Sequence, residues 1–229
     1  MLSNYGMSTE HEKRLAAEAA TKLIEPGMII GLGTGSTVGF LLPILARRKL
    51  SVRCVASSPR IEKLARDLGL QMESFNQLPR LDLSIDGADQ ITPEGWLNKG
   101  RGAAHTREKI IAAASDRFVI IADCTKLVSA LHGPVPLELL SFGLSATLQR
   151  LEPTTVRSIS PSPDGGVIAD YQGPVSDPRT LAAWLESVPG VIEHGLFPPE
   201  LVTEAWIARG DSVERLEFNT AMRSVRTSA

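Results

Sequence analysis

Residues 99–109 hold the side chains with the clearest chemical potential in this chain. Lys99 is followed at once by Gly100 and then by Gly102, and Glu108 stands in the helix-like run that comes next. Glycine lets a backbone approach a ligand closely, because it has no Cβ and tolerates a positive φ. A lysine before such a loop and a glutamate after it supply an electrophile and a base for one small anionic molecule. The segment therefore predicts an enzyme active site.

A second glycine-rich loop, residues 31–37, has the composition of an anion-binding turn. It is not a P-loop, because no lysine follows its last glycine. It departs from the dinucleotide fingerprint, because Ser36 stands at the third glycine position and residues 53–60 contain no acidic side chain. Amides at a helix N-terminus, with the hydroxyls of Thr34, Ser36 and Thr37, would form an anion cradle. We favour phosphate binding over the alternative, a tight turn with a Ser/Thr cap.

The loop from Asp86 to Asp89 carries two carboxylates after an apolar strand-like run. An Asp-Gly pair is often only a turn, but a second carboxylate on the same edge favours hydroxyl binding or acid–base chemistry. The two could also hold a divalent metal. The four histidines are scattered and show no metal-ligand spacing, so we predict no metal site.

Three charged residues, Glu108, Lys126 and Lys13, have both a structural and a functional interpretation. Glu108 could have a purely structural role, because the helix macrodipole favours an acidic residue in the first turn of a helix whatever the function. Lys126 could reach a phosphate or could be a solvated loop lysine. Lys13 has the same two interpretations, and a surface position is the commoner one for such a lysine.

Composition excludes several classes of partner. The net charge of -2 and the pI near 6.1, without any block of Lys or Arg, argue against nucleic acid. The longest apolar runs, residues 28–32 and 118–122, are far shorter than the about 20 residues of a membrane span. Cys54 and Cys124 stand in apolar runs and are interpreted as reduced core thiols. With no signal-peptide pattern, these features predict a cytoplasmic protein.

Strand-like and helix-like segments alternate up to residue 122, which predicts a parallel sheet with helices on both faces. Ligand sites in such sheets lie beyond the carboxyl ends of the strands, where the three polar loops fall. We expect strands at residues 28–32, 51–57, 70–75, 81–85 and 118–122, and helices at residues 11–24, 37–46, 60–68 and 105–115.

The pattern changes near residue 133. Strands at residues 135–140, 155–159, 167–171 and 191–196 and helices at 142–151 and 178–187 follow in the order β-α-β-β-α-β, the ferredoxin-like unit. Residues 201–207 and 213–218 could be strands that return to the first sheet. We therefore predict an α/β fold. A Rossmann-like parallel-sheet domain, residues 1–133 plus 206–229, contains an inserted smaller ferredoxin-like α+β domain, residues 134–205.

Taken together, these segments resemble type A ribose-5-phosphate isomerases. The family combines a Rossmann-like and a ferredoxin-like domain, uses no metal or organic cofactor and usually forms homodimers or tetramers, which is what the resemblance implies here. The matching motifs occur in the family's order and spacing over nearly the whole chain: EPG at 25–27, GLGTGST at 31–37, DGAD at 86–89, KGRGAAHTREK at 99–109, DCTK at 123–126, PVPLEL at 134–139 and GVIEHGLF at 190–197.

The resemblance implies isomerisation of D-ribose 5-phosphate to D-ribulose 5-phosphate through an enediolate, a step of the non-oxidative pentose phosphate pathway. Glu108 would move the proton between C2 and C1, and Lys99 would stabilise the enediolate oxygen. Asp86 and Asp89 would hold sugar hydroxyls and assist ring opening. The implied catalytic residues are Glu108, Asp86, Asp89 and Lys99. The implied substrate-binding residues are Thr34, Gly35, Ser36, Thr37, Asp86, Gly87, Ala88, Asp89, Lys99, Gly100, Arg101, Gly102, Lys126 and Lys13.

Four residues around the expected pocket depart from the family pattern. Arg101 replaces the middle glycine of the usual Lys-Gly-Gly-Gly, and His105 replaces a usual leucine. Gln90 and Thr92 stand where an acidic pair is usual. These departures leave open a divergent family member that acts on another sugar phosphate, or one that senses a sugar phosphate without turnover.

An NADP-dependent oxidoreductase is a further alternative. Ser57, Ser58 and Arg60 follow the second expected strand, where they could accept a 2′-phosphate. Lys99 and Glu108 weigh against this alternative and against a sensor, because a protein that only binds needs no base beside an electrophile.

Overall fold

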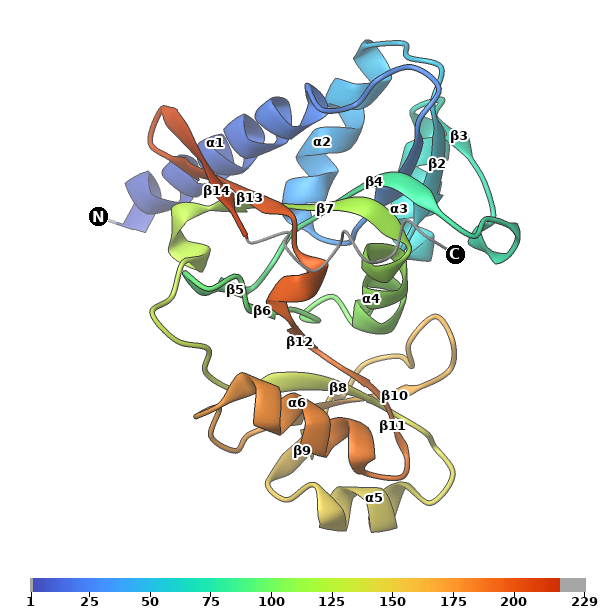
Figure 1. Cartoon of the computed structure of the whole chain (residues 1–229), viewed down its shortest axis with the longest axis vertical. Coiled ribbons are helices and arrows are strands. Elements are labelled where there is room, and N and C mark those ends of the chain that lie inside the picture. Colours follow the sequence, from blue (N-terminus) through green and yellow to red (C-terminus); the bar gives the residue numbers. More distant parts are fainter. Residues whose placement is uncertain (1, 219–229) are drawn as a thin grey trace.

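The computed structural model describes the backbone of residues 2–218 and the side chains of residues 9–218 (Figure 1). In this part of the chain, a seven-stranded sheet has the order β14-β13-β7-β4-β1-β2-β3 and a four-stranded sheet has the order β11-β8-β10-β9. A three-stranded sheet, β12-β6-β5, lies between the two in Figure 1. The larger and the smaller sheet form the cores of two units.

The predicted parallel sheet is confirmed. Its strands run parallel except for β14, which pairs antiparallel with β13 at one edge. The predicted return of the chain to this sheet after the second unit is also confirmed. The bounds are β1 Ile29–Leu32, β2 Arg53–Ala56, β3 Gln71–Met72, β4 Leu81–Asp86, β7 Ser115–Asp123, β13 Glu204–Arg209 and β14 Ser212–Glu217.

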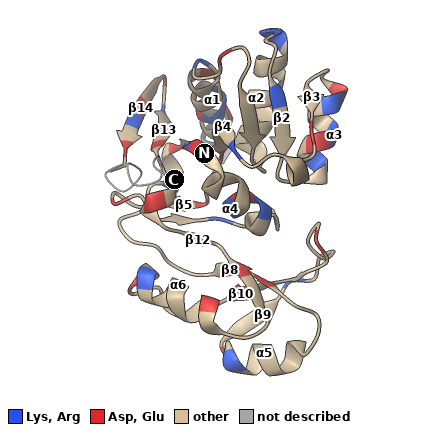
Figure 2. Cartoon of the chain, turned by 45° about the vertical axis from the view of Figure 1, so that its right-hand side comes forward, with Lys and Arg blue, Asp and Glu red and all other residues tan. Residues whose placement is uncertain are grey.

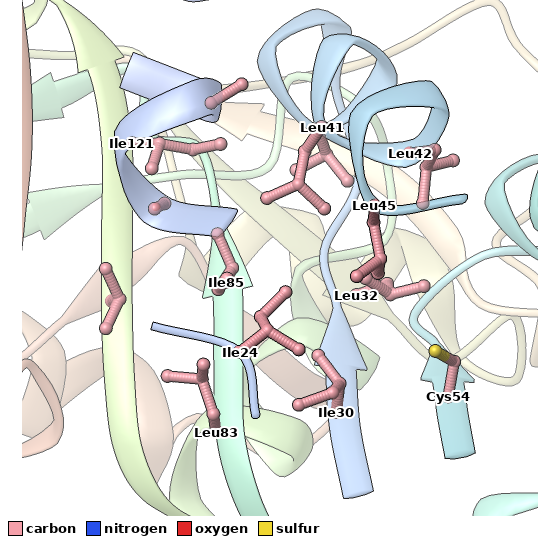
Figure 3. Packing of buried hydrophobic residues seen from close by; sticks show 14 of the residues in the cluster. Ile24, Ile30, Leu32, Leu41, Leu42, Leu45, Cys54, Leu83, Ile85 and Ile121 are labelled. Atoms are coloured by element: carbon pink, nitrogen blue, oxygen red, sulfur yellow. The ribbon is translucent and has the colours of Figure 1, made fainter. Parts of the chain in front are cut away.

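Helices cover both faces of the seven-stranded sheet. α1 (Leu2–Thr21), α2 (Ser36–Arg47) and α3 (Pro59–Asp67) bury apolar side chains in one cluster, which includes Leu32, Leu41 and Ile85 (Figure 3). On the opposite face α4 (His105–Ala113) packs so closely on β1 that a Cβ on Gly31 would lie 2.5 Å from Ile111. α1 begins at Leu2 rather than at residue 11, because each residue added to an existing helix gains a backbone hydrogen bond.

The smaller unit has the predicted β-α-β-β-α-β order, and its four strands are all antiparallel. The fold class is therefore confirmed, whereas the division at residues 133/134 and 205/206 stays a prediction. The sheet and its two helices share one apolar cluster. The bounds are β8 Val135–Leu139, α5 Leu144–Arg150, β9 Thr154–Val156, β10 Val167–Tyr171, α6 Pro178–Ser187 and β11 Val191–His194.

The three-stranded sheet is absent from the sequence prediction. It consists of β5 (Gln90–Ile91), β6 (Leu97–Asn98) and β12 (Leu196–Phe197), all antiparallel. Because β6 runs directly into Lys99, this small sheet positions the third polar loop. Short 3-10 helices, η1 (Phe75–Gln77), η2 (Cys124–Lys126) and η3 (Pro199–Leu201), complete the elements.

Charged residues of both signs are interspersed over the two units (Figure 2), in keeping with the small net charge. None of the helices in the described part of the chain is long and apolar enough to span a membrane.

Candidate active site

The first glycine-rich loop joins β1 to α2. Gly33 lies against Asp86, and a Cβ on Gly33 would stand 1.9 Å from Cγ of Asp86, so only glycine fits there. Gly35 is the N-cap of α2 and has a φ of 135°, which also favours glycine. No side chain caps this helix. The first-turn amides of α2 are therefore open to an anion.

Lys99 is buried between two carboxylates. Its Nζ lies 2.9 Å from Oδ2 of Asp86 and 3.1 Å from Oε2 of Glu108, and it donates a hydrogen bond to the carbonyl of Gly87. Each of the three charged side chains is at most 4% exposed. The carboxyl end of β4 and the first turn of α4 thus meet at one ammonium group.

This cluster shifts the pKa of all three groups. Burial, and after it the nearby Asp86 carboxylate, raise the pKa of Glu108 from 4.5 to about 7, although Lys99 opposes the shift. Burial also raises the pKa of Asp86, although Lys99 opposes this shift. Burial alone would lower the pKa of Lys99, but Asp86 and Glu108 raise it above its ordinary value. With two carboxylates and one ammonium, the cluster becomes neutral when it takes up one proton, which burial favours.

The loop after Lys99 is tightly constrained. The N–H of Lys99 donates to the carbonyl of Gly195 at 2.8 Å, and Gly100 has a φ of 116°. Ala103, with a φ of 56°, is the non-glycine residue of this loop in the left-handed region. Arg101 has no positive φ, so its side chain replaces a glycine without backbone strain.

Asp89 and Arg101 face each other on the open side of the site. The N–H of Arg101 donates to Oδ2 of Asp89 at 3.2 Å, and its Nε lies 3.5 Å from Oδ1. The Arg101 side chain is 81% exposed, so solvent screens this pair strongly. Asp89 is therefore only loosely engaged and accessible to a ligand.

These loops enclose a cavity of about 290 Å³. Asp86 is 2% exposed and lies behind the lining, against Lys99. Lys13 reaches the cavity from α1, and Lys126 reaches it from η2. Apart from Asp86, every residue of the predicted substrate-binding set lines the cavity, and so does Glu108. The lining residues are Lys13, Thr34, Gly35, Ser36, Thr37, Gly87, Ala88, Asp89, Lys99, Gly100, Arg101, Gly102, Glu108 and Lys126.

Several residues of the smaller unit contact this loop or α4, and two of them, Arg157 and Glu138, were not among the predicted site residues. Arg157 donates from Nη1 to the carbonyls of Gly100 and Arg101, at 3.0 and 3.2 Å. Glu138 accepts a hydrogen bond from the hydroxyl of Thr106 on α4. Glu138 stands inside the PVPLEL motif, but Arg157 stands in none of the motifs, so no local signal could have indicated it.

Two of the residues that depart from the family pattern, Gln90 and Thr92, have hydrogen-bond partners within the protein. Gln90 donates to the carbonyl of His132 at 2.9 Å, and Thr92 accepts from the N–H of Trp96 at 3.3 Å. His105 is fully buried, and this burial lowers its pKa from 6.5 to about 3. The histidine is therefore neutral at physiological pH.

The hydroxyls suggested for a 2′-phosphate are used within the protein. Ser57 is fully buried and bonds to Thr34 at 2.7 Å, and Ser58 caps α3 by accepting from the N–H of Ile61 at 3.4 Å. This arrangement does not favour the NADP alternative. Within residues 9–218, no group of three or more His, Cys, Asp or Glu side chains is placed to hold a metal ion.

The fold and the site define a class of protein: a two-unit α/β protein in which an anion-binding loop and a buried carboxylate–lysine cluster share one cavity. The chain belongs, within that class, to the ribose 5-phosphate isomerase A family. The family's sequence model, described as ribose 5-phosphate isomerase A (phosphoriboisomerase A), matches residues 53–212.

Individual relatives match over almost their full length. The ribose-5-phosphate isomerase A of Caulobacter sp. (strain K31) is 40% identical, covering 92% of this chain and 99% of the relative. The ribose 5-phosphate isomerase A structure from Neisseria gonorrhoeae is 29% identical, with a TM-score of 0.88 and coverage of 93% and 98%. A D-ribose-5-phosphate isomerase in complex with phospho-erythronic acid is 32% identical, with a TM-score of 0.86 and coverage of 91% and 99%.

Proposed function

We propose that this chain interconverts D-ribose 5-phosphate and D-ribulose 5-phosphate through an enediolate. The observation that carries the proposal is the contact of Lys99 with both Asp86 and Glu108 in a cavity that an anion-binding loop borders. Family membership supports it, as does the solved relative that binds phospho-erythronic acid. Sensing without turnover is not favoured, because a sensor needs no such cluster.

The phosphate group is assigned to the end of the cavity formed by α2. The uncapped first-turn amides and the hydroxyls of Ser36 and Thr37 provide donors, and the helix dipole favours a negative charge there. Lys13 and Lys126 add two positive charges from other elements. This end fixes the substrate, so that C1 and C2 lie near Glu108.

Glu108 is the proposed general base. Isomerisation needs one group that removes the proton from C2 and returns it to C1, and such a group works best with a pKa near the operating pH. The pKa of Glu108, raised to about 7, gives comparable amounts of the ionised and the protonated forms at neutral pH. The same carboxyl group can therefore take the proton and deliver it.

Lys99 is the proposed electrophile. Enediolate formation places negative charge on the former carbonyl oxygen, and a preorganised ammonium group in a water-poor site stabilises that charge. The two adjacent carboxylates raise the pKa of Lys99 and keep it protonated. Asp86, which lies behind the cavity lining, is assigned to holding this ammonium in place. Asp89, which lines the cavity, is assigned to the sugar hydroxyls and to ring opening.

The cellular setting is part of the same proposal. We assign the enzyme to the non-oxidative pentose phosphate pathway, in the cytoplasm, without a cofactor and as a homodimer or homotetramer. The free thiols of Cys54 and Cys124 support a reducing compartment. The oligomeric state rests on the family resemblance.

The test is formation of ribulose 5-phosphate from ribose 5-phosphate, with EDTA present and no added cofactor. We expect turnover by the parent chain and a loss in kcat of about 10²–10⁴-fold in Glu108→Gln, which keeps the shape of the side chain but removes the base. Glu62→Gln, on the exposed face of α3, is the matched control and should be unaffected. A folded parent without turnover would refute the proposal, and an active Glu108→Gln would remove Glu108 from its role.

A further inference from the structure

The smaller unit contacts the segment that carries Lys99 and Glu108 at several points. The carbonyl of Gly195 accepts the N–H of Lys99, and side chains of β8, of the turn before β10 and of β11 bond to α4. The contacts are Thr106 with Glu138, Arg107 with Asp164, and Lys109 with Glu193 and the carbonyl of His194. A further residue of the smaller unit, Arg157, donates hydrogen bonds to two backbone carbonyls of the loop, those of Gly100 and Arg101.

Arg157 is a firmly held side chain. It follows β9 and forms a two-pronged ion pair with Asp170 of β10, with Nε and Nη2 at 2.7 and 2.6 Å from the two carboxylate oxygens. The two side chains are only 17% and 18% exposed. Such a fork-to-fork pair fixes the guanidinium plane. The remaining nitrogen, Nη1, then reaches the carbonyls of Gly100 and Arg101.

These two hydrogen bonds hold the carbonyls of Gly100 and Arg101 and so help to set the direction of the amides that follow them. A trans peptide is planar, so an anchored carbonyl fixes the following N–H on the opposite side. The N–H of Arg101 accordingly reaches Asp89, which lines the cavity. By the same geometry the N–H of Gly102 points away from Arg157, and Gly102 also lines the cavity.

The surroundings of Gly100 restrict the conformation of the loop at this residue. Gly100, at a φ of 116°, sits where a Cβ would lie 2.7 Å from Pro136 and 2.8 Å from His105. A glycine-rich loop has high backbone entropy when it is not anchored. Within the loop, the carbonyl of Gly100 accepts the N–H of Ala103 at 3.1 Å. The anchor that reaches both carbonyls from outside the loop is Arg157, which does not itself line the cavity.

We propose that Arg157 is a positioning residue: from outside the cavity it sets the direction of the Arg101 and Gly102 amides and the placement of Lys99 for the transition state. This inference rests on the proposed isomerase function. The anchor needs the planar guanidinium group of arginine, because Asp170 accepts hydrogen bonds from two of its nitrogens and the loop carbonyls accept from the third. Lysine supplies the charge without that geometry.

The test compares Arg157→Met and Arg157→Lys with Arg107→Met. The control removes another two-pronged pair, which joins Arg107 of α4 to Asp164 of the smaller unit at 2.7 Å from both nitrogens, but it does not touch the loop carbonyls. Because displaced catalytic groups mainly affect the transition state, Arg157→Met should lower kcat about 10- to 100-fold and change KM less than about 3-fold. Arg157→Lys should lose at least about 5-fold in kcat, and Arg107→Met should stay within about 2-fold.

Calorimetry of ligand binding separates positioning from a merely structural role, because a structural defect would not weaken the binding of one ligand selectively. Phospho-erythronic acid carries a planar anionic carboxylate at the sugar end, whereas inorganic phosphate probes only the α2 end. We expect Arg157→Met to weaken the former and leave the latter unchanged. Equal losses for both ligands, or a kcat of Arg157→Lys equal to that of the parent, would overturn the inference. If the parent lacks isomerase activity, the proposed function fails, whereas the two binding measurements still decide the role of Arg157.

Discussion

The raised pKa of Glu108 makes the pH dependence of kcat a direct test of the site. Glu108 acts as a base only when it is ionised, so activity should fall as the pH drops through its pKa of about 7. At pH 5 a group with that pKa is about 1% ionised, which predicts a kcat about 100-fold below the plateau that is reached near pH 9. At its ordinary pKa of 4.5 the same group would be about three quarters ionised at pH 5, and kcat would hardly change.

The assay measures ketose formation at saturating ribose 5-phosphate between pH 4.5 and 9. Asp86→Asn sharpens the test, because the Asp86 carboxylate is one cause of the raised pKa of Glu108. In that variant the plateau should fall and the acid limb should move to lower pH. The substrate phosphate, with a second pKa of about 6, titrates equally in both proteins and cannot produce the shift. An acid limb near pH 4.5 in the parent, or an unmoved limb in Asp86→Asn, would refute the electrostatic argument.

Two further predictions concern the phosphate end and the buried histidine. Thr37→Ala and Lys126→Ala should weaken binding of ribose 5-phosphate more than binding of ribose in calorimetry, and equal losses would remove the phosphate assignment. His105 is neutral when folded, with a pKa of about 3 against 6.5 unfolded, so it costs stability as the pH falls below 6.5, about 2 kcal/mol by pH 5. His105→Leu should abolish that loss in urea unfolding at pH 7 and 5. The exposed His11→Leu is the control, and an unchanged pH dependence in His105→Leu would contradict the prediction.

The main sheet was predictable because its strands are locally encoded. Residues 28–32 and 118–122 are short apolar runs bounded by turns, and they form β1 and the centre of β7. The small sheet was not predictable. β5, β6 and β12 have two residues each, too few for any periodicity, and β12 joins β6 from a point about 100 residues further along the chain.

The composition of the site followed from the sequence, but its internal geometry did not. The rule that ligands bind beyond the carboxyl ends of parallel strands was enough to bring the loops of Thr34, Asp86 and Lys126 together. The contact between Asp86 and Lys99 depends on the missing Cβ of Gly33 and on the reversal of the chain after β6, which spacing alone does not encode. Nothing near Arg157 indicates that it reaches across to the loop.

The order of β13, β7 and β4 in the main sheet has a consequence for synthesis of the chain. β7 ends at residue 123, but its neighbour β13 begins at residue 204, after the whole smaller unit has been made. At about 5–20 residues per second, the ribosome needs about 4–16 s to produce the intervening 80 or so residues. During that interval β7, a nine-residue strand containing Phe118 and Ile120, is an open sheet edge. The nascent protein is therefore exposed to strand-to-strand association at this edge until the hairpin of β13 and β14 emerges.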